Sequence, residues 1–318
     1  MRILKDFIVA LNFLSALIGA GLASGKEVVV FLGNANLFSI ILCGVLIGAF
    51  SYPFIYLGIK SNGNTTSLIF HKNEYVGTIV MRIINFVFLG AMLSGAESLL
   101  QQTLGIHYGG FIIAVLTLII FQFGDNFIKG LNSLTTPLVL VFLIVLYCFK
   151  NTSIMGNYTL KYPLLYASMN TTCAGVYAGN FCKELKRHDA LFIGVIIASF
   201  ISIFLVIVRS LIIGVENTEI PIYSVAKDTN LTILGGLVVM ISILTSCVSS
   251  LRLASSKKPM SPFIVTAFAL ILSFFGFGNV VKFLYPVIGV IGLIILVLAI
   301  CRMILIKLKK CKKLGLGL

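Results

Sequence analysis

The chain has 318 residues, of which 59% are hydrophobic and only 11% are charged. Soluble globular proteins carry about 25% charged residues, so this chain has too few to cover a surface in water. A membrane-spanning helix needs roughly 20 apolar residues, and the long uncharged runs suffice for about ten such helices. The composition therefore predicts an all-α integral membrane protein. It excludes a separate soluble domain, and the unbroken apolar runs exclude a transmembrane β-barrel, whose strands alternate polar and apolar residues.

Ten spans are expected where apolar runs lie between polar, glycine or proline interruptions. They fall at 7–32, 37–59, 77–103, 108–124, 132–149, 162–183, 190–214, 231–252, 263–277 and 281–306. We expect one transmembrane domain over 1–318, with five spans in each of two halves at 1–149 and 161–306. Because five is odd, the second half enters the membrane from the opposite side, so the halves would form an inverted repeat.

The formal net charge of +14 would suggest nucleic-acid binding in a soluble protein, but here the position of the cations matters more than their sum. With the amino terminus in the cytoplasm, the inner loops and both termini hold 17 of the 24 Lys and Arg residues, six of them at 302–313. The positive-inside rule then places both termini in the cytoplasm. The segment 307–318 is expected to be a basic tail that contacts anionic lipid headgroups. No nucleic-acid partner is expected.

Each half begins with a span that small and polar residues interrupt near its middle. The first contains Gly19, Ala20, Gly21, Leu22, Ser24 and Gly25, and the sixth contains Ser168, Asn170, Thr171, Thr172 and Gly175. Interrupted spans at corresponding positions are typical of a transporter binding site. Close helix packing is the alternative, since Gly21 and Gly25 have the GxxxG spacing of membrane helix contacts. Lys26 and Glu27 follow the first interruption and favour a site, because packing needs no charge at that depth.

An interrupted helix offers backbone groups to a ligand. Unpaired N–H and C=O groups are costly in lipid unless protein or water satisfies them. The amino-terminal end of a half-helix carries partial positive charge and suits a carboxylate, while the free carbonyls of the opposite end suit a cation. A zwitterionic amino acid or a similar small solute fits both ends, with or without Na⁺. We therefore expect the substrate to bind at the small and polar residues of the two interruptions.

The third span has a polar stripe at helical spacing, made of Gly90, Ser94, Glu97 and Gln101. An ionisable residue inside a span is costly and is by default a functional candidate. Glu97 is therefore a candidate to carry a coupling proton. A structural ion pair, with Lys26 as its partner, or a place at the aqueous mouth is the alternative.

The eighth span has a face of hydroxyl groups past its midpoint, which includes Thr245 and Ser246. Hydroxyls that face the carbonyls of a broken helix can complete a Na⁺ shell. Ser and Thr also join helices in membranes by hydrogen bonds. The sequence leaves both interpretations open.

The segment at 18–27, IGAGLASGKE, resembles the GAG-x-ASG-x-E first-span pattern of the YkvI-like bacterial membrane proteins, and MLSGAE at 92–97 is similar to their third span. The similarity extends over all ten predicted spans. This family is placed in the amino acid-polyamine-organocation superfamily. The resemblance therefore implies a LeuT-type fold, with broken first and sixth helices in a 5+5 inverted repeat, and a location in the bacterial plasma membrane.

The resemblance also implies alternating access, in which spans 1, 2, 6 and 7 move against spans 3, 4, 8 and 9. The substrate would lie between the two interruptions, and a Na⁺ ion would lie between spans 1 and 8, near Leu22, Thr245 and Ser246. The resemblance and the residues' own chemistry together give the ion-coupling candidates Glu97, Lys26, Glu27, Gly19, Leu22, Thr245 and Ser246.

The function expected is secondary transport of a small solute, an amino acid or a related compound, coupled to Na⁺ or H⁺. No GxxxxGK[ST] segment is present, so ATP would not drive transport directly. An enzyme would need a nucleophile with its base or a metal cluster. The three histidines and seven cysteines do not have such spacing, so neither catalysis nor a bound cofactor is expected. A receptor that binds a solute without transporting it is the alternative, whereas a channel would need a filter motif.

Overall fold

The computed structural model describes residues 2–18, 20–61, 64–179, 182, 185, 189–255 and 261–313. Within them the chain is almost wholly helical, as predicted, and one isolated bridge pairs Ala35 with Asn157. The helices are α1 (Arg2–Leu17), α2 (Ala20–Ser24), α3 (Lys26–Leu32), α4 (Leu37–Lys60), α5 (Thr65–Phe70), η1 (His71–Asn73), α6 (Glu74–Leu104), α7 (Gly109–Phe121), α8 (Asp125–Phe149), α9 (Lys161–Gly179), α10 (Asp189–Ile212), α11 (Pro221–Asp228), α12 (Thr232–Ala254), α13 (Pro262–Ser273) and α14 (Phe277–Lys313).

Five of the described helices, α4, α6, α10, α12 and α14, are long and apolar enough to cross a membrane. Three shorter apolar helical segments lie at Gly109–Phe121, Leu134–Phe149 and Pro262–Ser273. The chain therefore has the helices of a multi-pass membrane protein.

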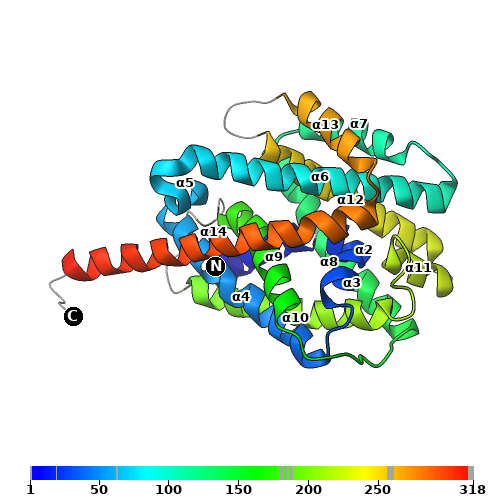
Figure 1. Cartoon of the computed structure of the whole chain (residues 1–318), viewed down its shortest axis with the longest axis horizontal. Coiled ribbons are helices and arrows are strands. Elements are labelled where there is room, and N and C mark those ends of the chain that lie inside the picture. The colour runs from blue at the N-terminus through cyan, green and yellow to red at the C-terminus, as the bar shows by residue number, and fades with distance from the viewer. Residues whose placement is uncertain are drawn as a thin grey trace.

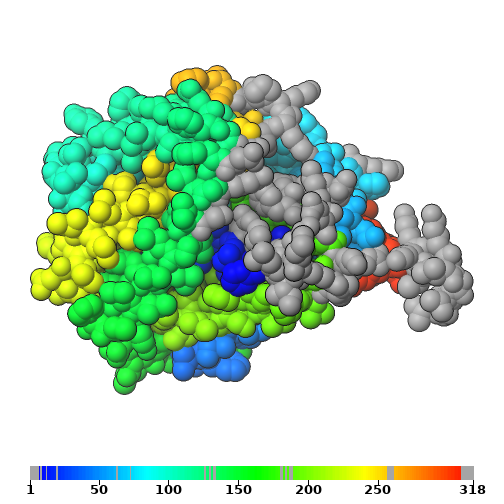
Figure 2. All heavy atoms as spheres, turned by 180° about the vertical axis from the view of Figure 1, so that it is seen from behind, coloured from blue at the N-terminus to red at the C-terminus, as the bar shows by residue number. Residues whose placement is uncertain are grey.

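The helices form two groups (Figure 1). The first contains α4, α9 and α10 with the interrupted first span, α1 to α3, and the second contains α6, α7, α12 and α13. Helix α8 packs against α1, α10 and α12, while α14 packs against α4, α6 and α9, so these two helices join the groups. From behind, α1 is visible as a blue patch between α8 and α10 (Figure 2).

Helices of the first half pack on their counterparts in the second half. Helix α1 contacts α9, α4 contacts α10, α6 contacts α12 and α7 contacts α13. A pseudo-twofold arrangement of two similar halves would bring these pairs together. The inverted 5+5 repeat itself stays a prediction.

The first span is interrupted, as predicted. Helix α1 ends at Leu17, α2 has only five residues, and α3 begins at Lys26. Gly25 joins α2 to α3 with a φ of 81°, in the left-handed region that favours glycine. A Cβ at Gly25 would lie 3.0 Å from side chains of both α10 and α11, so the glycine also allows these helices to approach.

The sixth span contradicts the prediction, because α9 continues as one helix from Lys161 to Gly179. The interruption expected at 168–175 is therefore absent. Ser168, Asn170 and Thr172 all donate hydrogen bonds there without unwinding of the helix. Ser168 Oγ, for example, donates across to the Gly289 carbonyl of α14 at 2.8 Å.

Close packing of α9 on α14 explains the remaining small and polar residues. Thr172 Oγ1 donates to the Gly292 carbonyl at 3.2 Å. A Cβ at Gly292 would lie 2.8 Å from the Ser168 carbonyl oxygen, so the two backbones approach closely there. Small residues and hydroxyl groups commonly join two continuous membrane helices, so their presence does not require a broken helix. The packing interpretation is thus correct for this part of the sixth span.

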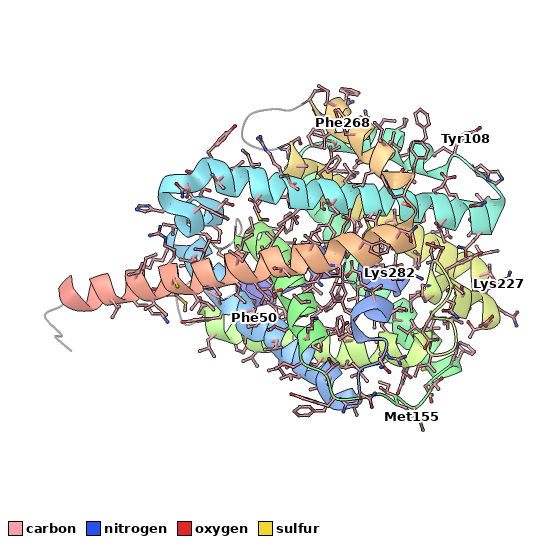
Figure 3. The ribbon with its side chains drawn as sticks, in the orientation of Figure 1. Phe50, Tyr108, Met155, Lys227, Phe268 and Lys282 are labelled. Atoms are coloured by element: carbon pink, nitrogen blue, oxygen red, sulfur yellow. The ribbon has the colours of Figure 1, made fainter. Side chains whose placement is uncertain are left out.

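The loops predicted to lie outside the cell meet at one end of the molecule. Tyr108, before α7, and Lys227, in α11, both lie at this end (Figure 3). Arg209 of α10, which is 4% exposed, donates to the Gly33 carbonyl after α3 and forms an ion pair with Glu216 at 3.7 Å. These contacts tie the loops after α3 and α10 together. Which side of the membrane they face stays a prediction.

At the opposite end, the carboxyl-terminal part of α14 extends beyond the other helices (Figure 1). Helix α14 begins earlier than predicted, because Gly276, with a φ of 83°, forms the turn after α13. The helix continues through Lys313, so the first part of the predicted basic tail is helical. Lys307 Nζ donates to the Tyr52 hydroxyl at 3.0 Å and lies over the Tyr52 and Tyr56 rings. Contact of the tail with lipid headgroups stays a prediction.

Candidate functional site

A cavity of about 80 Å³ lies where the interrupted first span meets α6, α9 and α12. A cavity needs roughly 10–15 Å³ to hold one water molecule. If each non-hydrogen atom of a solute takes the volume of one water molecule, the cavity has room for about five to eight such atoms. Because α6 and α12 belong to the second helix group, the cavity lies between the two groups. Its lining consists of Ser15, Ala16, Leu17, Gly21, Glu27, Asn85, Phe88, Met92, Asn170, Cys173, Tyr177, Thr245, Ser246, Ser249, Ser250 and Leu253.

Glu27 is the one charged side chain among the described residues of this lining. It lies in the first turn of α3, is 4% exposed, and its Oε2 accepts no hydrogen bond. Its carboxylate lies against Gly21, where an added Cβ would be 1.5 Å from Oε1. No Lys or Arg of the described residues forms an ion pair with it. The fold thus holds a carboxylate without a counter-charge at the cavity wall.

Two tyrosine hydroxyls lie close to this carboxylate. Tyr166 of α9 is beside it, although the geometry falls short of a hydrogen bond, and Tyr285 of α14 is near enough to interact electrostatically. Both tyrosines are fully buried, and neither hydroxyl has a hydrogen-bond partner. Phe88, which lines the cavity, packs edge-on against Tyr285 at 4.9 Å between ring centroids. Buried polar atoms without partners are costly and call for an explanation, such as a ligand, an ion or water.

Three other polar side chains of the wall each donate one hydrogen bond within their own helix. Asn85 Nδ2, Asn170 Nδ2 and Thr245 Oγ1 donate to backbone carbonyls of α6, α9 and α12 at 2.7, 3.1 and 3.1 Å. Their amide oxygens and hydroxyl lone pairs remain free to accept hydrogen bonds. The wall therefore offers oxygen acceptors to a bound solute, beside serine hydroxyls that can either donate or accept.

Five residues predicted from the sequence come together at this cavity: Gly21, Glu27, Asn170, Thr245 and Ser246. Gly19 lies outside the described residues, and the surroundings of the Ala20 side chain are also not described. Leu22, Ser24 and Gly25 do not belong to the lining. Leu22 is fully buried in the core, and Ser24 Oγ donates to the Gly21 carbonyl at 2.9 Å, which closes the short helix α2.

Most of the predicted residues of α9 lie outside the lining. Ser168 and Thr172 contact α14, Thr171 is buried with an unpartnered hydroxyl, and Gly175 packs on α4, where a Cβ would lie 2.7 Å from the Phe54 ring. A continuous helix turns by about 100° per residue, so a run of polar residues cannot all face one cavity. The face that does so carries Asn170 with Cys173 and Tyr177, three and seven positions later.

The other two charged candidates lie away from the cavity. Glu97 Oε2 accepts from the Gly110 N–H in the first turn of α7 at 2.9 Å. A carboxylate there satisfies a free helix N–H and interacts favourably with the helix dipole. Lys26 Nζ donates to the Thr218 and Glu216 carbonyls at 2.6 and 3.4 Å and, within the described residues, does not pair with Glu97. A coupling role for Glu97 or Lys26 stays a prediction.

Sequence reasoning missed the face of α6 that lines the cavity. The polar stripe drew attention to positions 90, 94, 97 and 101, whereas the lining uses Asn85, Phe88 and Met92. An asparagine within an apolar span could have given a signal, since polar residues at membrane depth are often functional. Tyr166 and Tyr285 gave no signal, because only the fold brings them close to Glu27.

No cluster of three or more His, Cys, Asp or Glu that could hold a metal ion occurs within the described ranges. For the predicted Na⁺ position, Thr245 and Ser246 line the cavity together with Gly21, while Leu22 lies in the core. The identity of a coupling ion stays a prediction.

Comparison with known proteins gives similarity over almost the whole chain, although no family model matches it. The uncharacterized membrane protein YkvI of Bacillus subtilis (strain 168) is 25% identical over 92% of this chain and 94% of its own length. The uncharacterized protein YyaD of the same organism is 24% identical over 94% of this chain and 97% of its own.

Among solved structures, Mhp1 has a similar fold. Mhp1, a nucleobase-cation-symport-1 family transporter, in a closed conformation with bromovinylhydantoin bound, gives a TM-score of 0.59 at 13% identity, over 91% of this chain and 70% of Mhp1. Its inward-facing conformation gives 0.53 at 12% identity, over 98% and 72%. The fold is LeuT-like. At these identities the similarity concerns the fold alone, and membership of the amino acid-polyamine-organocation superfamily stays a prediction.

Proposed function

We propose that this protein is a secondary transporter that moves a small solute, an amino acid or a related compound, by alternating access coupled to Na⁺ or H⁺. The observation that carries the proposal is the cavity between the two helix groups, at the interruption of the first span. Its volume of about 80 Å³ suits a solute of that size. The fold similarity to Mhp1, a transporter, supports the proposal.

The packing on either side of the cavity supports a transport cycle. Toward the end predicted to face outward, Gly25 packs against α10 and α11, and Lys26 Nζ holds the loop between these helices. Toward the predicted cytoplasmic end, the cavity lining continues along α12 from Thr245 to Leu253. Leu253 lies in the last turn of α12, which also contains Arg252. In this conformation the cavity extends toward the predicted cytoplasmic end. Movement of one helix group against the other would expose it to the opposite side.

Two features of the cavity support coupling to a cation. The hydroxyl residues Thr245 and Ser246 share the cavity with Gly21, as a Na⁺ position between spans 1 and 8 requires. Glu27 is an acidic group at the same wall and could carry a proton instead. Both belong to the proposal, and separate gradients distinguish them.

The deciding experiment is uptake by purified protein in liposomes, with a panel of labelled amino acids and related solutes. Na⁺ and pH gradients are imposed one at a time, and protein-free liposomes and an ionophore that collapses each gradient are the controls. Accumulation that follows one gradient supports transport and identifies the ion. Measurable binding without accumulation under either gradient would replace the transporter by a solute receptor. Chemical conversion of a solute would indicate an enzyme.

A further inference from the structure

One carboxylate supplies the charge that the described residues bring to the cavity. Within the described part of the chain, Glu27 lines it and no Lys, Arg or His does. Lys26, its neighbour in sequence, points its ammonium group to the carbonyls of Thr218 and Glu216. A buried carboxylate is costly unless a cation, hydrogen bonds or a proton compensates it. As far as the structure describes it, the wall holds no positive group, and a bound solute could supply one.

The hydrogen-bonding capacity of the wall indicates the same kind of solute. An ammonium group has three donors and no acceptor. Glu27 Oε2 has no partner, and the side-chain oxygens of Asn85, Asn170 and Thr245 remain able to accept from such a group, although each of these side chains also donates within its own helix. A solute carboxylate placed directly beside Glu27 would instead meet a like charge.

Aromatic rings supply a further attraction for a cation. Phe88 and Tyr177 both belong to the lining. The face of an aromatic ring attracts a cation within about 6 Å, and more strongly when water is excluded. A ring face turned toward a cationic solute would thus add to the attraction of Glu27.

We infer that Glu27 binds a positively charged nitrogen of the solute, so that the cavity selects small amines, including zwitterionic amino acids, over anions and neutral analogues. This inference rests on the proposed function, because it names the class of solute for the same cavity. The absence of a side chain at Gly21 leaves the space that the carboxylate occupies. The cavity volume restricts the amine to about five to eight non-hydrogen atoms.

Binding to the full-length protein in nanodiscs, without any gradient, tests the inference. The probes are two pairs that differ only in NH₃⁺ against OH: isobutylamine with isobutanol, and L-valine with 2-hydroxyisovalerate. Calorimetry measures the affinity of each probe for the wild type and for Glu27→Gln, which keeps the shape of the side chain but removes its charge. Glu74→Gln, the same chemical change outside the cavity, is the matched control.

The wild type and Glu74→Gln are expected to prefer the amine of each pair by about 30-fold or more, the effect of one desolvated charged partner. Glu27→Gln is expected to lose this preference, and Glu27→Asp, which retains the charge, to keep most of it. Thermal melting of each variant reports whether it is folded. If the wild type binds neither amine, or if Glu27→Gln keeps the preference, the inference is wrong.

Two further results separate the alternatives. If replacing KCl by NaCl stabilises the wild type but not Glu27→Gln, while the amine preference persists in the variant, Glu27 is a Na⁺ ligand and the inference is overturned. If the amine preference depends on Glu27 but liposomes accumulate no solute, the inference holds and the transport proposal fails. If liposomes accumulate a solute but the protein shows no amine preference, the transport proposal holds and the inference fails.

Discussion

Gly21→Ala is expected to displace the Glu27 carboxylate from the cavity wall. The added Cβ would lie 1.5 Å from Oε1, 2.2 Å from Cδ and 2.8 Å from Cγ of Glu27. Ordinary contact begins at 3.4 Å, so Oε1 must retreat by about 1.9 Å, the difference between the two distances. Glu27 is 4% exposed and lies beside the fully buried Tyr166, so its surroundings must give way as well.

The size of the effect follows from this clash. One extra methyl group in a packed core typically costs about 1–3 kcal/mol. If the displaced carboxylate is the group that binds the solute, the same free energy corresponds to a loss of affinity of about 5- to 150-fold. Gly95→Ala is the matched control, because its Cβ would lie 3.5 Å or more from its neighbours, which is ordinary contact. We expect no measurable loss for that variant.

Thermal melting and solute binding of the purified variants provide the assay. The double variant Gly21→Ala/Glu27→Ala removes the side chain that clashes, so it should recover the stability lost in Gly21→Ala without recovering binding. The coupling between the two substitutions should be about 0.5–3 kcal/mol, as for residues in contact. If Gly21→Ala melts and binds like Gly95→Ala, the Glu27 carboxylate does not occupy the position described, and the reasoning is refuted.

Three more outcomes test other parts of the structure. Gly292→Ala should destabilise the protein by about 1–3 kcal/mol, because its Cβ would lie 2.8 Å from a backbone carbonyl of α9. Gly130→Ala is the control, because a Cβ there meets no atom within 4 Å. Equal melting temperatures of the two variants would contradict the close α9–α14 contact. Glu97→Gln should leave uptake and its pH dependence unchanged, because the amide oxygen can still accept from the first turn of α7; a lost pH dependence would instead support proton coupling. Lys26→Met should weaken closure of the predicted outer side by about 1 kcal/mol, because it removes the hydrogen bonds to the loop before α11. The measurement is the rate at which a thiol reagent labels a cysteine introduced by Ile222→Cys, which should rise. An unchanged rate would argue against this closure.

Local chemistry was sufficient to predict the class of fold and its first interruption. The apolar runs dictate membrane helices, because only segments that satisfy their own backbone hydrogen bonds are stable in lipid. The interruption before Lys26 also has a local cause, since Gly25 adopts a positive φ that other residues rarely reach. A charge beside that interruption pointed to Glu27, although sequence reasoning singled out Glu97 as the candidate to carry a coupling proton.

The tertiary structure decided which polar groups face a cavity and which join helices. Ser168 and Thr172 have the composition of a broken helix, yet α14 brings the carbonyls of Gly289 and Gly292 to their hydroxyls, and α9 remains continuous. By the same principle Glu97 caps α7 in the structure, whereas Glu27 lies at the cavity with no Lys or Arg of the described residues in the same lining. A polar side chain in an apolar run has the same local sequence signal in either role. Its role depends on the partners that distant segments supply, and only the packed helices determine those partners.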